Sequence, residues 1–361
     1  MISIIIPTFN EAENVKIIVP KLTQMLKDSD ISGEILIVDD NSPDGTAGAA
    51  LELAERYPVK VHVRYAEKGL SKAVIEGFER AEGDICVVMD ADLSHPVEQV
   101  PEMITPILND QCDVTVGSRY VEGGGFDRFP LHRKWISKGA GLLAKGVTRI
   151  SDPTSGFMAV RKKLLEGVRL DPLGWKIVLE VVVKTNPRIV EVPIVFTDRK
   201  EGQSKLDFRA QIDYVHHLWR LYNHRYPSQF EFIKFCLVGL SGFFVDTAVL
   251  VCLVHFYLFD PRLAAVFAFL IAVCWNYVLD RVWTFNSGRK TRISYSYPSF
   301  VMICLAGLGI RIGVMHLLIA YAGMGKSPWY VLASVIGIFV ATFFNFLGSK
   351  YIAFSTRFHK S

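Results

Sequence analysis

Residues 232–361 contain four stretches that are long and apolar enough to cross a lipid bilayer. A hydrocarbon core of about 30 Å requires about 20 mainly apolar residues in a helix. Because lipid offers no hydrogen-bonding groups, such segments must satisfy their own backbone and therefore fold as helices. We predict an all-α membrane domain whose spans cover residues 232–258, 263–279, 299–321 and 328–349.

The basic residues between the spans predict their orientation, because cytoplasmic loops are rich in Lys and Arg. Such residues gather in the central connection and after the fourth span, at Arg281, Arg289, Lys290, Arg292, Lys350, Arg357 and Lys360. The other two connections hold only Arg262 and Lys326. We expect a multi-pass membrane protein with both termini and its first half in the cytoplasm. Ile2–Ile6 is also too short for a signal-peptide core.

The four spans contain an internal repeat. Cys236–Leu240 is echoed by Cys304–Leu308, and Trp275–Tyr277 by Phe344–Phe346, at offsets of 68 and 69 residues. We therefore expect two duplicated helical hairpins that run in the same direction.

Two charged residues interrupt these spans, Asp246 in the first and Arg311 in the third. A charge within a bilayer is costly and usually has a partner. A functional role, a structural ion pair and extension to the membrane surface all remain open.

Charge is divided unevenly along the chain. Residues 1–231 hold 29 Lys+Arg and 33 Asp+Glu, whereas residues 232–361 hold 11 and 3. The net charge of +4 therefore reflects the membrane half and does not indicate a nucleic-acid partner. The six cysteines form no Cys-x-x-Cys pair and four lie in apolar spans, which favours free thiols over a metal site or disulfides.

The first half alternates short β-rich runs with helical patterns, which predicts an α/β domain with a mainly parallel sheet. The expected strands are Ile2–Ile6, Glu34–Val38, Val59–Arg64, Asp84–Met89, Val114–Gly117 and Ile189–Phe196. In such sheets ligands bind beyond the carboxyl ends of the strands. Pro7–Glu11, Asp39–Asp44 and Asp90–Asp92 should therefore converge on one edge.

Asp90 and Asp92 form an Asp-x-Asp pair at a predicted strand end. Two such carboxylates suit a divalent cation that also holds a diphosphate. The alternative is a pair of turn or helix-capping aspartates. Lys68 and Lys72 flank a short loop that either lies near phosphates or is simply solvated.

Between the two halves, Ile212, Val215, Trp219, Tyr222 and Tyr226 recur at spacings of three and four. This spacing predicts a helix with one apolar stripe, flanked by basic residues. The pattern favours docking at the membrane interface, and packing against the α/β domain is the alternative. The segment His132–Lys145 mixes apolar and basic residues in a similar way.

Eight short runs of the first half, taken together, resemble the dolichyl-phosphate mannose synthases of the family 2 glycosyltransferases. These runs are Pro7–Glu11, Val38–Thr46, Met89–Pro96, Gly117–Tyr120, Arg133 with Ile136 and Ser137, Asp152–Phe157, Glu191–Pro193 and Gly202–Leu206. The membrane half resembles the small GtrA-like four-helix domain. The resemblance implies a GT-A (Rossmann-like) catalytic domain over 1–205, an interface helix or linker over 206–230 and a transmembrane domain over 231–361.

The resemblance also implies roles for matched positions. The donor would be held by Pro7, Phe9, Glu11, Asp39, Asp40, Lys68, Asp90, Ala91, Asp92, Arg199 and Lys205. Asp90 and Asp92 would bind Mg²⁺ or Mn²⁺, and Ser94 stands where some relatives have a metal-binding Gln. Arg119, Arg133 and Ser137 would hold the acceptor phosphate, with Asp92, Arg119 and Arg133 as the catalytic residues. Surface ion pairs, a backbone-bonded serine and juxtamembrane charges are the alternatives for Arg119, Arg133, Ser137, Arg199 and Lys205.

The implied reaction transfers mannose from GDP-mannose to dolichyl phosphate, or a related polyprenyl phosphate, with inversion to a β linkage. The acceptor phosphate is largely ionised at neutral pH, since its second pKa is near 6, so no general base is needed. The alternatives are a UDP-glucose:polyprenyl-phosphate glucosyltransferase and a lipid-linked sugar transporter with a non-catalytic domain. Residues 207–361 hold no Gln-x-x-Arg-Trp segment, which disfavours a processive polysaccharide synthase. A homo-oligomer is left open.

Overall fold

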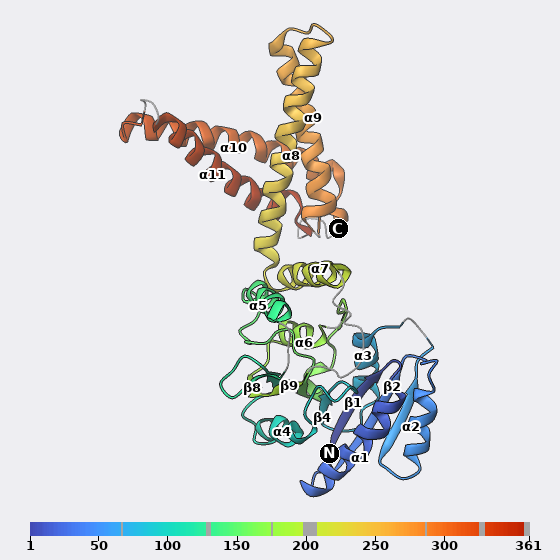
Figure 1. Cartoon of the computed structure of the whole chain (residues 1–361). Coiled ribbons are helices and arrows are strands. Elements are labelled where there is room, and N and C mark those ends of the chain that lie inside the picture. Colours follow the sequence, from blue (N-terminus) through green and yellow to red (C-terminus); the bar gives the residue numbers. More distant parts are fainter. Residues whose placement is uncertain are drawn as a thin grey trace. The chain divides into compact units, whose positions relative to one another are not determined.

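The computed structural model describes residues 1–65, 68–127, 131–174, 176–197, 208–285, 287–324 and 329–356. The chain divides into two compact units, Met1–Arg225 and Tyr226–Ser361. Both units are drawn in Figure 1.

The first unit is built on a seven-stranded sheet with the order β3-β2-β1-β4-β7-β5-β8. Neighbouring strands are parallel except for β7, which pairs antiparallel with β4 and β5. The strands are β1 (Ile2–Thr8), β2 (Gly33–Asp39), β3 (Val59–Val63), β4 (Ile85–Val88), β5 (Val114–Ser118), β7 (Met158–Arg161) and β8 (Ile189–Pro193). The helices are α1 (Ala12–Asp28), α2 (Thr46–Ala54), α3 (Leu70–Arg80), α4 (Val100–Leu108), α5 (Leu131–Ala144), α6 (Ile177–Thr185) and α7 (Phe208–Arg225).

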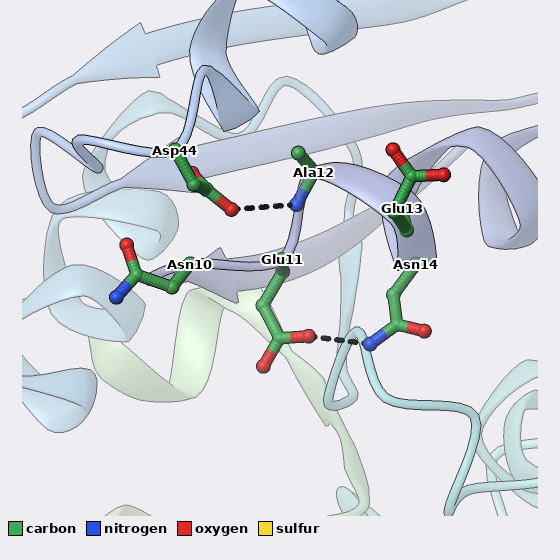
Figure 2. Close-up of a pocket in the computed structure, with 6 residues that line it drawn as sticks. All are labelled: Asn10, Glu11, Ala12, Glu13, Asn14 and Asp44. Atoms are coloured by element: carbon green, nitrogen blue, oxygen red, sulfur yellow. Dashed lines mark hydrogen bonds between the residues drawn. The ribbon is translucent and has the colours of Figure 1, made fainter. Parts of the chain in front are cut away.

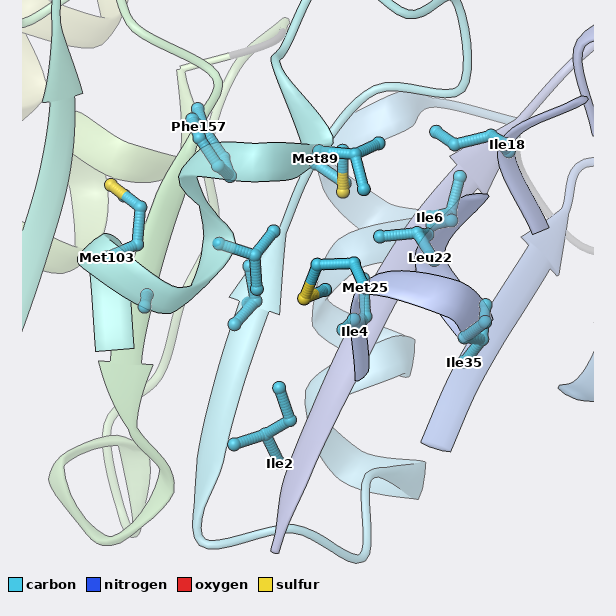
Figure 3. Packing of buried hydrophobic residues seen from close by; sticks show 14 of the residues in the cluster. Ile2, Ile4, Ile6, Ile18, Leu22, Met25, Ile35, Met89, Met103 and Phe157 are labelled. Atoms are coloured by element: carbon cyan, nitrogen blue, oxygen red, sulfur yellow. The ribbon is translucent and has the colours of Figure 1, made fainter. Parts of the chain in front are cut away.

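Both faces of the central strand are buried, which explains its unbroken run of isoleucines. Ile4 and Ile6 of β1 lie in a core with Ile18 and Leu22 of α1, as Figure 3 shows. Ile5 points to the other core, which α3 and α6 cover. Side chains alternate across a strand, so a strand between two helical layers needs apolar residues at every position.

The structure corrects two details of the predicted sheet. The predicted strand Ile189–Phe196 is two strands in different sheets, because β8 ends at Pro193 and β9 (Val195–Thr197) pairs with β6 (Gly125–Asp127). The four-residue antiparallel strand β7 was not predicted, since its short run carries no clear alternation.

Helix α7 has two apolar faces rather than one. Three residues of the predicted stripe, Ile212, Val215 and Trp219, are 53%, 55% and 44% exposed, whereas Tyr222 is partly buried. A second face packs inside the unit, where Leu218 and Leu221 join a core with α5 and α6. Hydrogen bonds from Tyr214 and Tyr222 to backbone carbonyls of α5 hold the two helices together. Packing and an exposed apolar stripe therefore coexist on one helix.

The described residues of the second unit include four helices that are long and apolar enough to cross a membrane, Pro227–His255, Pro261–Thr284, Ile293–Tyr321 and Trp329–Ala353. They comprise α8 (Pro227–His255), α9 (Pro261–Leu279), α10 (Ile293–Tyr321) and α11 (Trp329–Gly348), and π-helical turns follow α9 and α11. α8 packs on α9 and α10 packs on α11, giving two hairpins (Figure 1).

The hairpins repeat one another, but with a different register in their first helices. Asn276 of α9 faces Gly242, and Asn345 of α11 faces Gly307, each so closely that a Cβ on the glycine would collide with the amide. This contact pairs Gly242, not Gly239, with Gly307, an offset of 65 residues instead of the predicted 68. The offset of 69 in the second helices agrees with the Asn276–Asn345 equivalence. The stretch from the glycine to the asparagine is therefore four residues longer in the second repeat than in the first.

Candidate active site

Three adjacent parallel strands deliver the predicted donor-site residues to one edge of the sheet. β1 lies between β2 and β4, with Thr8 opposite Asp39 and Ile5 opposite Val88. The residues at the ends of these strands and just beyond them therefore lie side by side. They include Pro7, Phe9, Glu11, Asp39, Asp40, Asp90, Ala91 and Asp92.

Asp39 is fully buried and ties the first two strand ends together. Its Oδ1 accepts hydrogen bonds from the Thr8 and Ser42 hydroxyls at 2.9 and 2.6 Å, and its Oδ2 accepts the Ser42 amide at 2.8 Å. The neighbouring Asn41 has a left-handed backbone with φ of 52°. Asp39 thus shapes the loop in which the Asp40–Gly45 run lies.

Asp40 organises the loop that carries Lys68. Its carboxylate forms a buried ion pair with Arg64 and accepts the Gly69 amide at 2.7 Å. The ammonium of Lys68 lies 4.6 Å from the ring centre of Phe9, a cation–π contact between two predicted donor residues. Arg64 was not singled out in the sequence, because an arginine at the end of a strand carries no signal without its partner.

A polar hollow lies at the end of β1, lined by Asn10, Glu11, Ala12, Glu13, Asn14 and Asp44 (Figure 2). Asp44 accepts the Ala12 amide at 3.1 Å, and Asn14 donates to Glu11 at 2.6 Å. Burial alone would raise the pKa of Asp44, but hydrogen bonds from Thr46 and Ala12 lower it below its usual value. The hollow contains Glu11 but neither Asp90 nor Asp92, so it marks only one end of the candidate site.

The segment Asp90–His95 forms a tight acidic turn after β4. Leu93 adopts a left-handed backbone with φ of 62°, and the Ser94 amide donates to Asp92 Oδ1 at 3.0 Å. His95 Nδ1 accepts the Asp90 amide at 3.0 Å. The buried ring of His95 stacks on Phe157 at 5.1 Å, which anchors the turn to the Asp152–Phe157 run.

The acidic turn has several features that bear on binding of a divalent cation. Among the described residues no group of three or more His, Cys, Asp or Glu side chains is arranged to hold a metal ion. The turn does contain a buried polar atom with no hydrogen-bond partner in the part of the chain that the structure describes, the Ser94 hydroxyl. Mg²⁺ and Mn²⁺ accept one or two carboxylates and take their other ligands from substrate phosphates and water. Asp90 and Asp92 therefore fit a cation that arrives with a diphosphate, and the Ser94 hydroxyl suits a water on it.

Arg119 is held in a buried ion pair, not the surface pair named as its alternative. Its Nε and Nη2 donate to the two oxygens of Asp152 at 2.6 and 2.7 Å. Asp152 is fully buried, and the side chain of Arg119 is 9% exposed. Nη2 also donates to Thr154 at 2.8 Å, and the Thr154 hydroxyl lies 3.0 Å from that of Ser137. Nη1 of Arg119 has no hydrogen-bond partner among the described residues.

One aromatic ring joins the acidic turn to this arginine. Phe196 of β9 lies 6.1 Å from the ring of His95 and 5.3 Å from the Arg119 guanidinium. The guanidinium also lies 5.2 Å from the ring of Phe126. The acidic turn and Arg119 therefore lie close together, although β4 and β5 are separated in the sheet by β7.

Lys176 is a further cation beside the candidate site, and no sequence motif singles it out. It lies immediately before α6, with its ammonium 5.7 Å from the ring of Tyr214. Burial, with the charge of Arg119 as the next cause, lowers the pKa of the Lys176 amine to about 8, against the opposing effects of Asp152 and Asp90. The amine is therefore within electrostatic reach of both the acidic turn and the Arg119–Asp152 pair.

Three predicted residues cannot be placed as side chains. Arg133 lies in α5, but its side chain is outside what the structure describes, and Arg199 and Lys205 lie outside the described residues altogether. Ser137, one turn along α5 from Arg133, reaches the Arg119 network through Thr154.

Two family models match the chain. Residues 3–169 match the glycosyl transferase family 2 model, and residues 234–359 match the GtrA/DPMS transmembrane domain model. The four apolar helices and the second match make this a membrane protein. A solved glucosyl-3-phosphoglycerate synthase from Mycobacterium tuberculosis has a TM-score of 0.48 and 18% identity over 62% of this chain and 79% of that one. No functional conclusion follows from so weak a likeness.

Curated relatives identify the family. The chain is 36% identical to the dolichol-phosphate mannosyltransferase of Pyrococcus furiosus, over 98% of this chain and 99% of that protein. It is 39% identical to the enzyme of the same name from Saccharomyces cerevisiae, over 63% of this chain and 88% of that one. The chain therefore belongs to the dolichol-phosphate mannosyltransferases, which are glycosyltransferases of family 2.

Proposed function

We propose that this enzyme transfers mannose from GDP-mannose to dolichyl phosphate, or a related polyprenyl phosphate, with inversion at the sugar carbon. The observation that carries the proposal is the joint site of the acidic turn and Arg119, connected through Phe196. A carboxylate pair beside a strand end suits a donor diphosphate with its cation. A buried arginine whose Nη1 has no partner among the described residues suits a second phosphate.

Asp90 and Asp92 would hold Mg²⁺ or Mn²⁺ together with the donor diphosphate. When bound, the cation would neutralise the negative charge that develops on the departing diphosphate. The remaining donor contacts would come from the β1 and β2 loops, where Phe9, Glu11 and Asp40 lie on the same sheet edge. Lys68, stacked on Phe9, would add a positive charge near the nucleotide.

Arg119 would bind the acceptor phosphate through Nη1, while Asp152 fixes the orientation of its guanidinium. Lys176 would add a second positive charge between the two phosphate-binding regions. Both cations would reduce the repulsion between an anionic nucleophile and an anionic donor, which is the main barrier to bringing them together. The acceptor needs no general base, because its phosphate is already ionised at neutral pH.

The exposed apolar side chains of α5 and α7 support a membrane-facing role for this side of the first unit. Trp135 and Leu142 of α5 are 74% and 66% exposed, and Trp219 of α7 is 44% exposed. Tryptophan suits the interface between lipid and water. We propose that these helices bring the site to the cytoplasmic face of the bilayer, which agrees with the basic central loop.

The direct test is transfer of labelled sugar to dolichyl phosphate by the purified full-length protein. GDP-mannose and UDP-glucose should be supplied separately, each with Mn²⁺ and with EDTA. The proposal expects labelled lipid only from GDP-mannose and only with the cation. Labelling from UDP-glucose alone would replace the mannose assignment with glucosyl transfer. The product linkage, determined by NMR, should be β from an α-linked donor.

A further inference from the structure

The two hairpins of the membrane unit meet in a stack of four aromatic rings. Tyr277 stacks on Phe354, Phe354 on Phe285, and Phe285 on Phe346, with centroid distances of 5.7, 5.1 and 5.9 Å. At the repeat offset of 69, Tyr277 corresponds to Phe346 and Phe285 to Phe354. Exchanging the two hairpins reverses the order of the four rings and leaves the stack unchanged, so the stack has a local twofold axis between Phe285 and Phe354. Equivalent residues of the two hairpins therefore lie at equivalent distances from this axis.

Asp246 and Arg311 occupy equivalent positions in the two repeats. Gly242 and Gly307 make the same contact with an asparagine, and each charged residue follows its glycine by four positions, about one helical turn. The repeats thus place a negative charge on α8 and a positive charge on α10, one turn beyond matching contacts. The 68-residue offset predicted from the sequence does not align Asp246 with Arg311.

Neither charge is neutralised by a described residue of the chain. Asp246 has no hydrogen bond or ion pair among these residues, although its side chain is only partly exposed. Arg311 is exposed, and its one side-chain hydrogen bond within the described part of the chain is to the Ser334 hydroxyl, at 3.4 Å. The two side chains form no ion pair with each other, since each helix packs against its own hairpin partner, α9 or α11.

Lipid does not satisfy both residues. Arg311 is able to extend towards a lipid phosphate, but Asp246 is shorter and is repelled by anionic headgroups. The aspartate therefore needs a cation from protein, and the complementary cation of this chain stands at the matching position of the other repeat.

We propose that the membrane unit forms a twofold-symmetric homodimer in which hairpin α8–α9 of one copy packs against hairpin α10–α11 of the other. In this arrangement Asp246 of each copy pairs with Arg311 of the second copy, giving two equivalent ion pairs. A twofold interface uses the same surfaces of both copies, as this exchange requires. The charge complementarity makes the occupant of these faces a second copy of this chain.

Charge reversal in full-length protein tests the proposal. Asp246→Arg and Arg311→Asp each place like charges together, whereas the double exchange Asp246→Arg/Arg311→Asp restores opposite charges. Dimer fraction is measured by single-molecule photobleaching in liposomes over a range of protein-to-lipid ratios. We expect each single variant to raise the dimer dissociation constant at least tenfold and the double exchange to return it to within threefold of wild type. Thr247→Arg, an exposed neighbour on α8, serves as the matched control and should remain dimeric.

A second measurement covers variants that insert poorly. Two differently tagged copies are co-expressed without native cysteines, one with Asp246→Cys and one with Arg311→Cys. The proposal expects a disulfide between the two tags on oxidation and none when both copies carry Asp246→Cys. A wild type that is monomeric at all ratios, single reversals that dimerise like wild type, or a 246–311 disulfide confined to one chain would each overturn it.

Discussion

Replacing Asp152 with asparagine should both destabilise the catalytic unit and impair use of the acceptor. The carboxylate of Asp152 is fully buried and binds Arg119 with two hydrogen bonds of 2.6 and 2.7 Å. Asparagine keeps the volume but removes the charge, and it turns an amide group towards the guanidinium. Removing one partner of a buried ion pair typically costs about 3–5 kcal/mol, because the other charge stays buried and unpaired.

Two measurements on full-length protein check this prediction. For a unit of this size each kcal/mol shifts the melting temperature by about 2–4 °C, so a loss of the order of 10 °C is expected for Asp152→Asn. The KM for dolichyl phosphate should rise. The KM for GDP-mannose should stay within about threefold of its wild-type value, which corresponds to a free-energy difference of roughly 0.7 kcal/mol at most.

An apolar replacement separates the two effects. In the double variant Arg119→Met/Asp152→Leu no buried charge is left unpaired, so the melting temperature should largely recover. Use of the acceptor should stay impaired, because the guanidinium is gone. The reasoning is refuted if Asp152→Asn melts within 2 °C of wild type with an unchanged acceptor KM, or if the double variant regains acceptor use.

Two further perturbations test other parts of the structure. Burial lowers the pKa of His217 from 6.5 to about 4, so the folded unit binds fewer protons than the unfolded chain between these values. Stability should therefore be unaffected above pH 6.5 and fall by up to about 3 kcal/mol as the pH drops to 4, and thermal unfolding of His217→Gln should lose this dependence. Trp219→Ser on the exposed face of α7 should raise the KM for dolichyl phosphate in bilayers about tenfold, because it removes about 1.5 kcal/mol of apolar contact. The KM for a short water-soluble isoprenyl phosphate should not change. An equal effect on both acceptors would argue against membrane docking by α7.

Much of the sheet was predictable because its strands end in unusual residues. Asp39 and Asp90 each follow a continuous apolar run, and parallel strands necessarily bring such ends to one edge. The four spans were predictable for a simpler reason, since their length and lack of charge allow few alternatives. The family resemblance is confirmed by the curated relatives.

Other features depend on tertiary contacts that no local pattern contains. Lys176 and Arg64 lie beside the candidate site because of partners far away in sequence, and neither lies in a distinctive motif. The predicted strand Ile189–Phe196 is two strands because Ile194, between β8 and β9, connects the two sheets. Its amide donates to the Ser118 carbonyl of β5, and its carbonyl accepts the Gly125 amide of β6. The predicted repeat aligns Gly239 with Gly307, whereas the structure aligns Gly242 with Gly307. The two glycines are told apart by the contact that Gly242 makes with Asn276.

The central claim is that Asp90 and Asp92 hold a divalent cation together with the donor diphosphate. Calorimetric titration of GDP into the wild-type protein and Asp92→Asn, each with Mn²⁺ and with EDTA, tests it most directly. The account predicts that EDTA weakens binding to wild type by about a hundredfold or more, roughly 2.7 kcal/mol, and that Asp92→Asn binds weakly in either condition. If Mn²⁺ strengthens GDP binding to Asp92→Asn as much as to wild type, the cation is held elsewhere and the proposed mechanism is wrong.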